Sequence, residues 1–90
     1  MPILSNIAAV TVSSTALIVA PANPTRRKLI VCQTSANPVR IGALGVLATT
    51  GIRLAQGERV IFEGVDCPTD AIYAIREGGV DGTVSAIEVA

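Results

Sequence analysis

The chain has 90 residues, of which half are apolar and 16% are charged, and its seven basic residues balance seven acidic ones. It has no histidine, the commonest general base and metal ligand, and Phe62 and Tyr73 are its only aromatic residues. These counts argue against an enzyme, a metal or cofactor site, and an aromatic platform for nucleic-acid bases. They favour a structural or binding module, and we assign no catalytic, cofactor-binding or metal-binding residue.

A chain of this length forms one domain. Surface scaling predicts about 4,900 Å² of folded surface against about 13,000 Å² for the unfolded chain, so that roughly 60% is buried. An apolar fraction of one half is more than so small a core hides. We therefore expect part of the apolar surface to face a partner subunit.

Short β-type runs separated by turn residues recur about every ten positions, which is typical of a small sandwich or barrel. The predicted strands cover residues 7–12, 15–20, 26–34, 39–43, 51–55, 58–63, 70–76 and 83–89, whereas residues 44–50 suit a loop or one helical turn. Gln56-Gly57 predicts a two-residue hairpin between its flanking runs. The predicted fold is all-β: a single small antiparallel β-sandwich or barrel, jelly-roll-like, with about seven or eight short strands.

The first 25 residues carry no charged side chain. The longest uninterrupted apolar stretch among them, residues 16–20, is too short for a signal-peptide core or a membrane span. We expect residues 1–22 to form an N-terminal hairpin or a docking arm, and residues 23–90 to form the β-sandwich core of the same domain. The large apolar residues of the first segment are candidates for contact with another subunit, with ordinary core strands as the alternative: Ile3, Leu4, Ile7, Leu17 and Ile18.

Charge is distributed unevenly along the chain. Residues 1–57 carry five basic residues and no acidic one, whereas residues 58–90 carry seven acidic and two basic residues, so the segments sum to +5 and −5. Either β-pairing mixes these charges on one surface, or two opposed patches favour ordered association with a neighbour. The short basic run at residues 26–28 and the zero net charge do not support nucleic-acid binding.

Cys32 and Cys67 lie 35 positions apart without a CxxC motif, which excludes the familiar zinc and redox motifs. One internal disulfide, two free thiols and bridges between subunits all remain open. Cys32 lies in an apolar run and is predicted to be a buried thiol, whereas Cys67 precedes Pro68 and is predicted to be the more exposed one. Tyr73 alternates with apolar neighbours and is predicted to lie in the core with its hydroxyl at the rim.

From residue 23 onward the chain shows a pattern of four strand-and-turn segments followed by a final strand. The four segments are residues 27–31 (RKLIV), 37–42 (NPVRIG), 51–58 (GIRLAQGE) and 71–75 (AIYAI). This pattern, over about three quarters of the chain, resembles a group of small β-rich structural proteins of tailed-bacteriophage virions. The chain departs from that pattern at Cys32, at Cys67, and at Gln56, where a proline is common. The first 22 residues match nothing specific.

The resemblance implies a virion structural protein, and most directly a capsid decoration (cement) protein. Such a protein binds and stabilises the assembled phage head as a homo-oligomer, with a homotrimer as the expected form. Its partners would be the major capsid protein and further copies of itself, with no nucleic acid and no membrane. It would be assembled in the host cytoplasm and lie on the outer surface of the capsid, and the five apolar residues of the first segment would contact a subunit or the capsid.

Two alternatives stay open. One is a neck, collar or tail accessory protein of a phage virion with the same fold. The other is a small non-viral ligand-binding β domain, which no visible constellation of residues supports.

Overall fold

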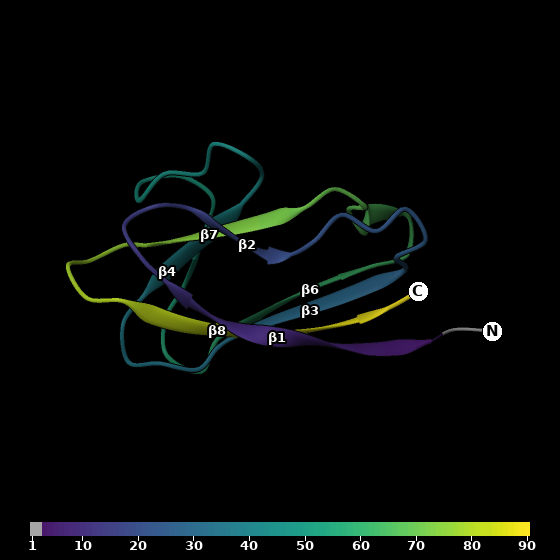
Figure 1. Ribbon diagram of the computed structural model, residues 1–90, viewed down its shortest axis with the longest axis horizontal. Coiled ribbons are helices and arrows are strands. Elements are labelled where there is room, and N and C mark those ends of the chain that lie inside the picture. The colour runs from purple at the N-terminus through teal and green to yellow at the C-terminus, as the bar shows by residue number, and fades with distance from the viewer. Residues whose placement is uncertain (1–2) are drawn as a thin grey trace.

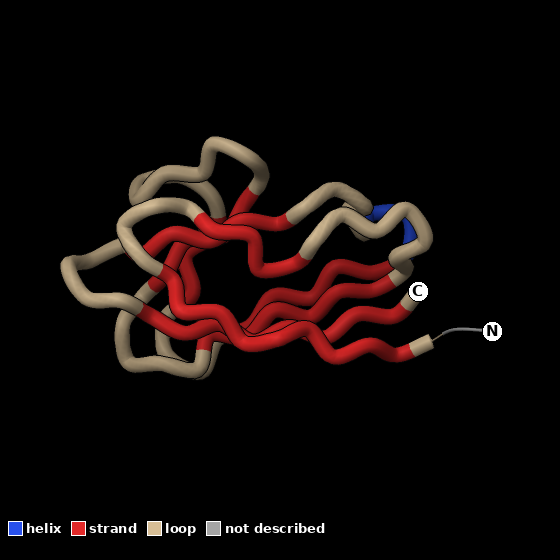
Figure 2. Tube along the Cα trace, viewed as in Figure 1, coloured by secondary structure: helices blue, strands red, loops and turns tan. Residues whose placement is uncertain are grey.

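The computed structural model describes residues 3–90, which form eight strands in two four-stranded antiparallel sheets (Figures 1 and 2). Sheet A has the order β1 (Leu4–Val12), β8 (Gly82–Val89), β3 (Lys28–Gln33) and β6 (Arg59–Glu63). Sheet B has the order β2 (Leu17–Ala20), β7 (Ile72–Arg76), β4 (Val39–Gly42) and β5 (Ile52–Leu54). Two such packed sheets with this strand order make a jelly roll, so the predicted all-β sandwich is confirmed.

Most connections carry the chain from one sheet to the other, and the turn at Gln56-Gly57 is one of them. Glu58 N–H donates to the carbonyl of Ala55 at 3.0 Å, and Gly57 adopts a positive φ of 78°. However, β5 pairs with β4 and β6 pairs with β3. The predicted hairpin is therefore wrong: the turn chemistry is as expected, but its two flanking strands belong to different sheets.

The segment before residue 23 contributes an edge strand to each sheet. β1 pairs with β8 along its length, with a one-residue bulge between Ile7 and Val10, and β2 pairs with β7. Beyond β1, the backbones of Ile3 and Ala90 exchange hydrogen bonds of 2.7 and 2.9 Å, which joins the first and last residues that the structure describes. The strands that they extend, β1 and β8, lie side by side (Figure 1). Residues 3–22 are thus integral to the sandwich rather than a separate hairpin or arm, and residues 1–2 of that predicted segment lie outside the described residues.

The core lies between the sheets and consists mainly of valine, leucine and isoleucine on alternating strand positions. In β3, for example, Leu29 and Val31 are fully buried while Ile30 and Cys32 face outward. The total accessible surface is 5042 Å², close to the value expected for this mass. The fully or nearly fully buried core side chains include Val12, Val19, Leu29, Val31, Val39, Ile41, Leu54, Ala74 and Val84.

Tyr73 lies on the outer face of sheet B, not in the core. Its neighbours in β7, Ile72 and Ala74, are 6% and 0% exposed, and the strand alternates. The prediction of a core tyrosine is wrong because both alternating sets of this strand are apolar. Alternation alone therefore could not say which set faces inward.

Candidate interaction surface

Three kinds of feature that would suggest a function are not found in the described part of the chain. Within residues 3–90, no group of three or more His, Cys, Asp or Glu side chains could hold a metal ion. Every buried side-chain nitrogen or oxygen in the same range has a hydrogen-bond partner. Among the described residues there is also no helix with the length and apolar character needed to cross a membrane.

A buried polar cluster around Arg26 holds one end of the sandwich together. The Arg26 side chain is fully buried, and its Nε lies 3.2 Å from Glu88 Oε1. Its Nη1 donates to the carbonyls of Pro68 at 2.8 Å and Asp70 at 3.1 Å, and its Nη2 donates to that of Pro21. Because its donors are used on three different segments of the chain, the cluster fixes loops rather than offering a binding site.

Asn23 completes this cluster from the side of the first loop. Its Nδ2 donates to Glu88 Oε2 at 3.0 Å, and its backbone N–H donates to the carbonyl of Thr69 at 2.8 Å. Both carboxylate oxygens of Glu88 therefore accept hydrogen bonds inside the chain, which offsets the cost of burying the charge.

Cys32 and Cys67 are both free and both half-buried. Cys32 lies on the outer face of sheet A, and Cys67 packs against the core near Arg26. Burial raises the pKa of the Cys67 thiol; nearby Arg26 opposes this shift and Glu88 adds to it. The prediction of a buried Cys32 thiol is therefore wrong, because this side chain is only half-buried.

The two thiols are too far apart to bridge within one chain. Cys67 N–H donates to the carbonyl of Gly64, and Gly64 N–H donates to the carbonyl of Arg27, so Cys67 lies close to the start of β3. Cys32 lies near the other end of that strand. Cys32 is the fifth residue after Arg27 along the strand and lies about 17 Å from it, whereas a disulfide needs Cα atoms within about 7 Å. A bridge between subunits stays a prediction.

The ion pairs show that β-pairing mixes the two oppositely charged halves of the chain. Among residues 3–90, four of the five ion pairs join a basic residue of the first segment, up to residue 57, to an acidic residue of the second, as the mixing alternative predicts. These four are Arg26–Glu88, Lys28–Glu63, Arg40–Glu77 and Arg53–Glu77.

The outer face of sheet B carries a charged triad over β4 and β5. The carboxylate of Glu77 lies 2.8 Å from Arg40 Nε and 2.9 Å from Arg53 Nε. The hydrogen bond from Arg53 lowers the pKa of Glu77, and Arg40 adds to this effect while burial opposes it. The same contact raises the pKa of Arg53. This part of the face therefore satisfies its charges within the chain.

The outer face of sheet A is apolar at its centre. Ile30 pairs with Ile87 on one side and with Ile61 on the other, so three isoleucines lie side by side across β8, β3 and β6. We call these residues the isoleucine row. Ile61 is 46% exposed, and Ile30 and Ile87 are half-buried although no other strand of the described residues covers this face.

Two further rows of outward-facing side chains flank the isoleucine row on the outer face of sheet A. Leu4 pairs with Val89 and Val89 with Lys28, and Cys32 lies between Ser85 and Arg59. A shallow hollow of about 270 Å³ opens here, lined by Asn6, Ile30, Cys32, Ser85, Ala86 and Ile87.

The five contact candidates from the sequence do not form one surface. Leu4 shares the outer face of sheet A with Val89, whereas Ile18 pairs with Tyr73 on the outer face of sheet B. Ile7 is half-buried and packs against the core, which is the alternative reading of that residue. The remaining candidates are exposed to different degrees: Ile3 65%, Leu4 64%, Ile18 46% and Leu17 38%.

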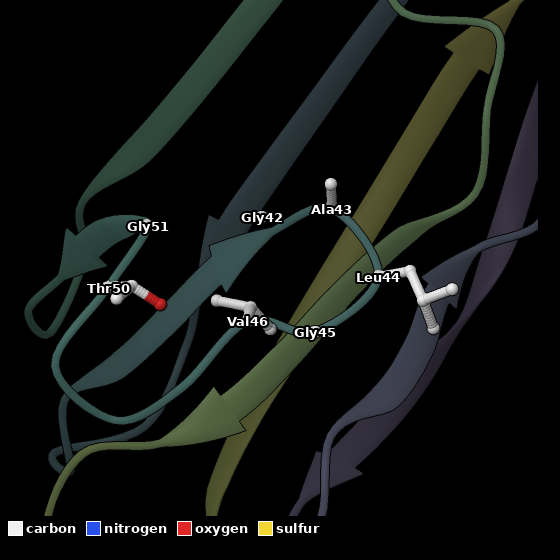
Figure 3. Close-up of a pocket in the computed structure, with 7 residues that line it drawn as sticks. All are labelled: Gly42, Ala43, Leu44, Gly45, Val46, Thr50 and Gly51. Atoms are coloured by element: carbon white, nitrogen blue, oxygen red, sulfur yellow. The ribbon is translucent and has the colours of Figure 1, made fainter.

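A loop between β4 and β5 presents a further apolar side chain. Val46 is 7% exposed and packs against the backbone at Gly42 and Gly51, and Leu47 N–H donates to Thr50 Oγ1 at 2.8 Å. Leu44 is 80% exposed and points away from Val46 (Figure 3). The cavity inside the loop is open and small, about 210 Å³, so its notable feature is the projecting leucine.

Sequence reasoning missed the isoleucine row, although part of the signal was present. The run at residues 26–34 is apolar on both faces, which indicates either a central strand or a strand exposed to a partner. The row itself depends on the register between three strands that are far apart in sequence. No local pattern specifies that register.

No protein-family model and no curated protein sequence matches the chain. Among solved structures, the chain is similar to one from a study described as "Bacillus endospore appendages form a novel family of disulfide-linked pili". The TM-score is 0.58, the sequence identity is 19%, and the similarity covers 98% of this chain and 85% of that chain. At this identity the similarity shows a shared fold, and the jelly roll is the property that the two chains have in common.

Proposed function

We propose that this protein is a non-enzymatic structural subunit of a tailed-bacteriophage virion that acts by binding other protein subunits, most directly as a decoration protein on the capsid. The observation that carries the proposal is the isoleucine row on the outer face of sheet A, which no other strand among residues 3–90 covers. Exposed apolar rows of this kind are the usual core of a protein–protein contact.

The mechanism is mass action. A protein that binds only the assembled shell stabilises it by its binding free energy, and many such contacts on one shell add together. The buried Arg26 cluster supports this role because it gives a 90-residue sandwich a fixed shape to present to the lattice. The assignment to a phage rests on the resemblance of the turn-and-strand segments.

A subunit of a surface filament is the second candidate. The similarity to a chain of the disulfide-linked pili of Bacillus endospores favours it, and half-buried, unbridged Cys32 lies on the outer face of sheet A. In this case the partners would be further copies of the chain alone.

Quantitative gel analysis of virions purified from cells that express the chain tests the proposal. A decoration protein is expected at a copy number comparable to that of the major capsid protein, and a neck or tail accessory at a small fraction of it. Absence of the chain from the virions, together with its presence in sheared surface filaments, would instead establish the second candidate.

A further inference from the structure

The outer face of sheet A carries opposite charges at matched distances from the isoleucine row. On β6, Arg59 precedes Ile61 by two residues and Glu63 follows it by two, and all three side chains alternate onto the outer face. Each charge therefore lies about 7 Å along the strand from Ile61. Lys28, on the neighbouring β3, pairs with Glu63 at 3.6 Å.

This arrangement is complementary to itself under one particular symmetry. When a two-fold axis runs along the isoleucine row, between two stacked copies of sheet A, it reverses the strand direction and sets each isoleucine against its own counterpart. It then brings Arg59 of each copy opposite Glu63 of the other, twice in one contact.

The other two-fold arrangement, with the axis along the strands, gives no such match. It would place Glu63 opposite Leu4 and Lys28 opposite Val89, since these four residues form one row across the sheet. Both charges would then be buried against apolar side chains, which is costly. The position of Glu63, opposite Arg59 in the first arrangement and opposite Leu4 in the second, therefore selects between them.

We infer that the outer face of sheet A is a self-association face, and that its occupant is a second copy of this chain stacked about the axis along the isoleucine row. The inference rests on the proposed function in one respect: a copy of itself is the partner that a repeating subunit meets. Two stacked sheets keep their strands within about 30° of one another, which sheet A can satisfy.

The size of the face sets the strength of the contact. Four strands at about 4.8 Å and three outward rows give roughly 400 Å² for each copy, about half of what a standard stable complex buries. The isolated pair is therefore weak, and it becomes stable where other contacts of a larger assembly hold the copies together.

The test is sedimentation velocity of the full chain over a series of concentrations, with variants of equal exposure. Wild type is expected to show a concentration-dependent dimer. Ile61→Lys should abolish it, whereas Ile18→Lys, at a residue that is also 46% exposed but lies on sheet B, should leave it unchanged. A monomer at every concentration, or loss of the dimer with Ile18→Lys alone, would overturn the inference.

A mixing experiment tests the symmetry itself. Arg59→Glu alone and Glu63→Arg alone each place like charges opposite one another twice, and each should raise the dissociation constant about tenfold. An equimolar mixture of the two variants pairs opposite charges at both positions and should recover the wild-type affinity as a heterodimer. No recovery in the mixture, with both variants folded by circular dichroism, would refute the arrangement.

These outcomes are separable from those for the proposed function. A chain that dimerises through sheet A but is absent from virions would contradict the phage assignment and still support self-association through this face. A chain that is found in virions but never dimerises would support the proposed function and contradict self-association through sheet A.

Discussion

The Arg26 cluster and the isoleucine row are two exceptional regions of one small sandwich, and they differ in where their partners lie. The cluster finds its partners inside the chain, in Glu88 and in the carbonyls of three loop residues. Within the part of the chain that the structure describes, the isoleucine row has no further strand packed on its outer side. Substitutions in the first region should therefore cost stability, and substitutions in the second should cost association.

The largest effect is expected from Arg26→Ala. This change leaves the buried carboxylate of Glu88 and the carbonyls of Pro21, Pro68 and Asp70 without their donor. We expect a loss of about 3–5 kcal/mol in the free energy of unfolding, measured by urea denaturation. The exposed neighbour Arg27 is the matched control, and Arg27→Ala should change stability by less than about 0.5 kcal/mol. Equal losses in both variants would contradict the role of the cluster.

Gly51→Ala should have the next largest effect. Gly51 adopts a φ of 77°, and a Cβ there would lie 2.2 Å from the carbonyl oxygen of Ile41. We expect a loss of about 2–3 kcal/mol from the steric clash and the unfavourable backbone conformation together. Gly57 has nearly the same φ, 78°, but open space around its Cβ position. Gly57→Ala should therefore reduce the free energy of unfolding by about 1 kcal/mol. An equally small loss for Gly51→Ala would show that the backbone around Gly51 moves enough to avoid the clash.

The Glu77 triad should make stability depend on acid pH. The pKa of Glu77 is lowered in the folded protein, chiefly by the hydrogen bond from Arg53. A carboxylate with a lowered folded pKa contributes stability above its unfolded pKa, about 4.3, and this contribution is lost as the pH falls through the folded value. The melting temperature of wild type should therefore exceed that of Glu77→Gln at neutral pH, and the difference should shrink below about pH 4. A difference that is constant with pH would contradict the triad.

The smallest effect concerns the reactivity of Cys67. Burial raises the pKa of its thiol, so its thiolate fraction at neutral pH is below that of a free cysteine. In the Cys32→Ser variant, alkylation of Cys67 by iodoacetamide should be slower in buffer than in urea at the same pH. Equal rates would mean that the thiol is not protected by the fold.

Much of the fold could be predicted from local patterns, whereas strand pairing could not. Because side chains of a strand alternate, the sequence alone separates Leu29 from Ile30 in β3, Val60 from Ile61 in β6 and Ile87 from Glu88 in β8, and the structure places each pair on opposite faces. Gln56-Gly57 was recognised as a turn, but whether a turn makes a hairpin or crosses between sheets depends on distant partners. The prediction that Tyr73 lies in the core was wrong for a related reason: the strand has apolar residues on both faces, so its alternation does not show which face is the inner one.

The candidate site was the part least accessible to sequence. The uncharged first segment drew attention to Ile3, Leu4 and Ile18, yet the structure divides these residues between different parts of the surface. The isoleucine row joins residues 30, 61 and 87, which come together only through the β3–β6 and β3–β8 registers. A surface made of three strands distant in sequence leaves no contiguous motif.

Cys32 offers the most direct test of the central claim, because its thiol lies on the outer face of sheet A beside the isoleucine row. In the Cys67→Ser variant, the rate of Cys32 alkylation is measured against protein concentration, with the reagent in constant excess. If a second copy covers this face, the rate should fall as the protein becomes more concentrated, and the added change Ile61→Lys should remove that protection. A rate that is independent of concentration, while the protein demonstrably associates, would show that the copies meet elsewhere.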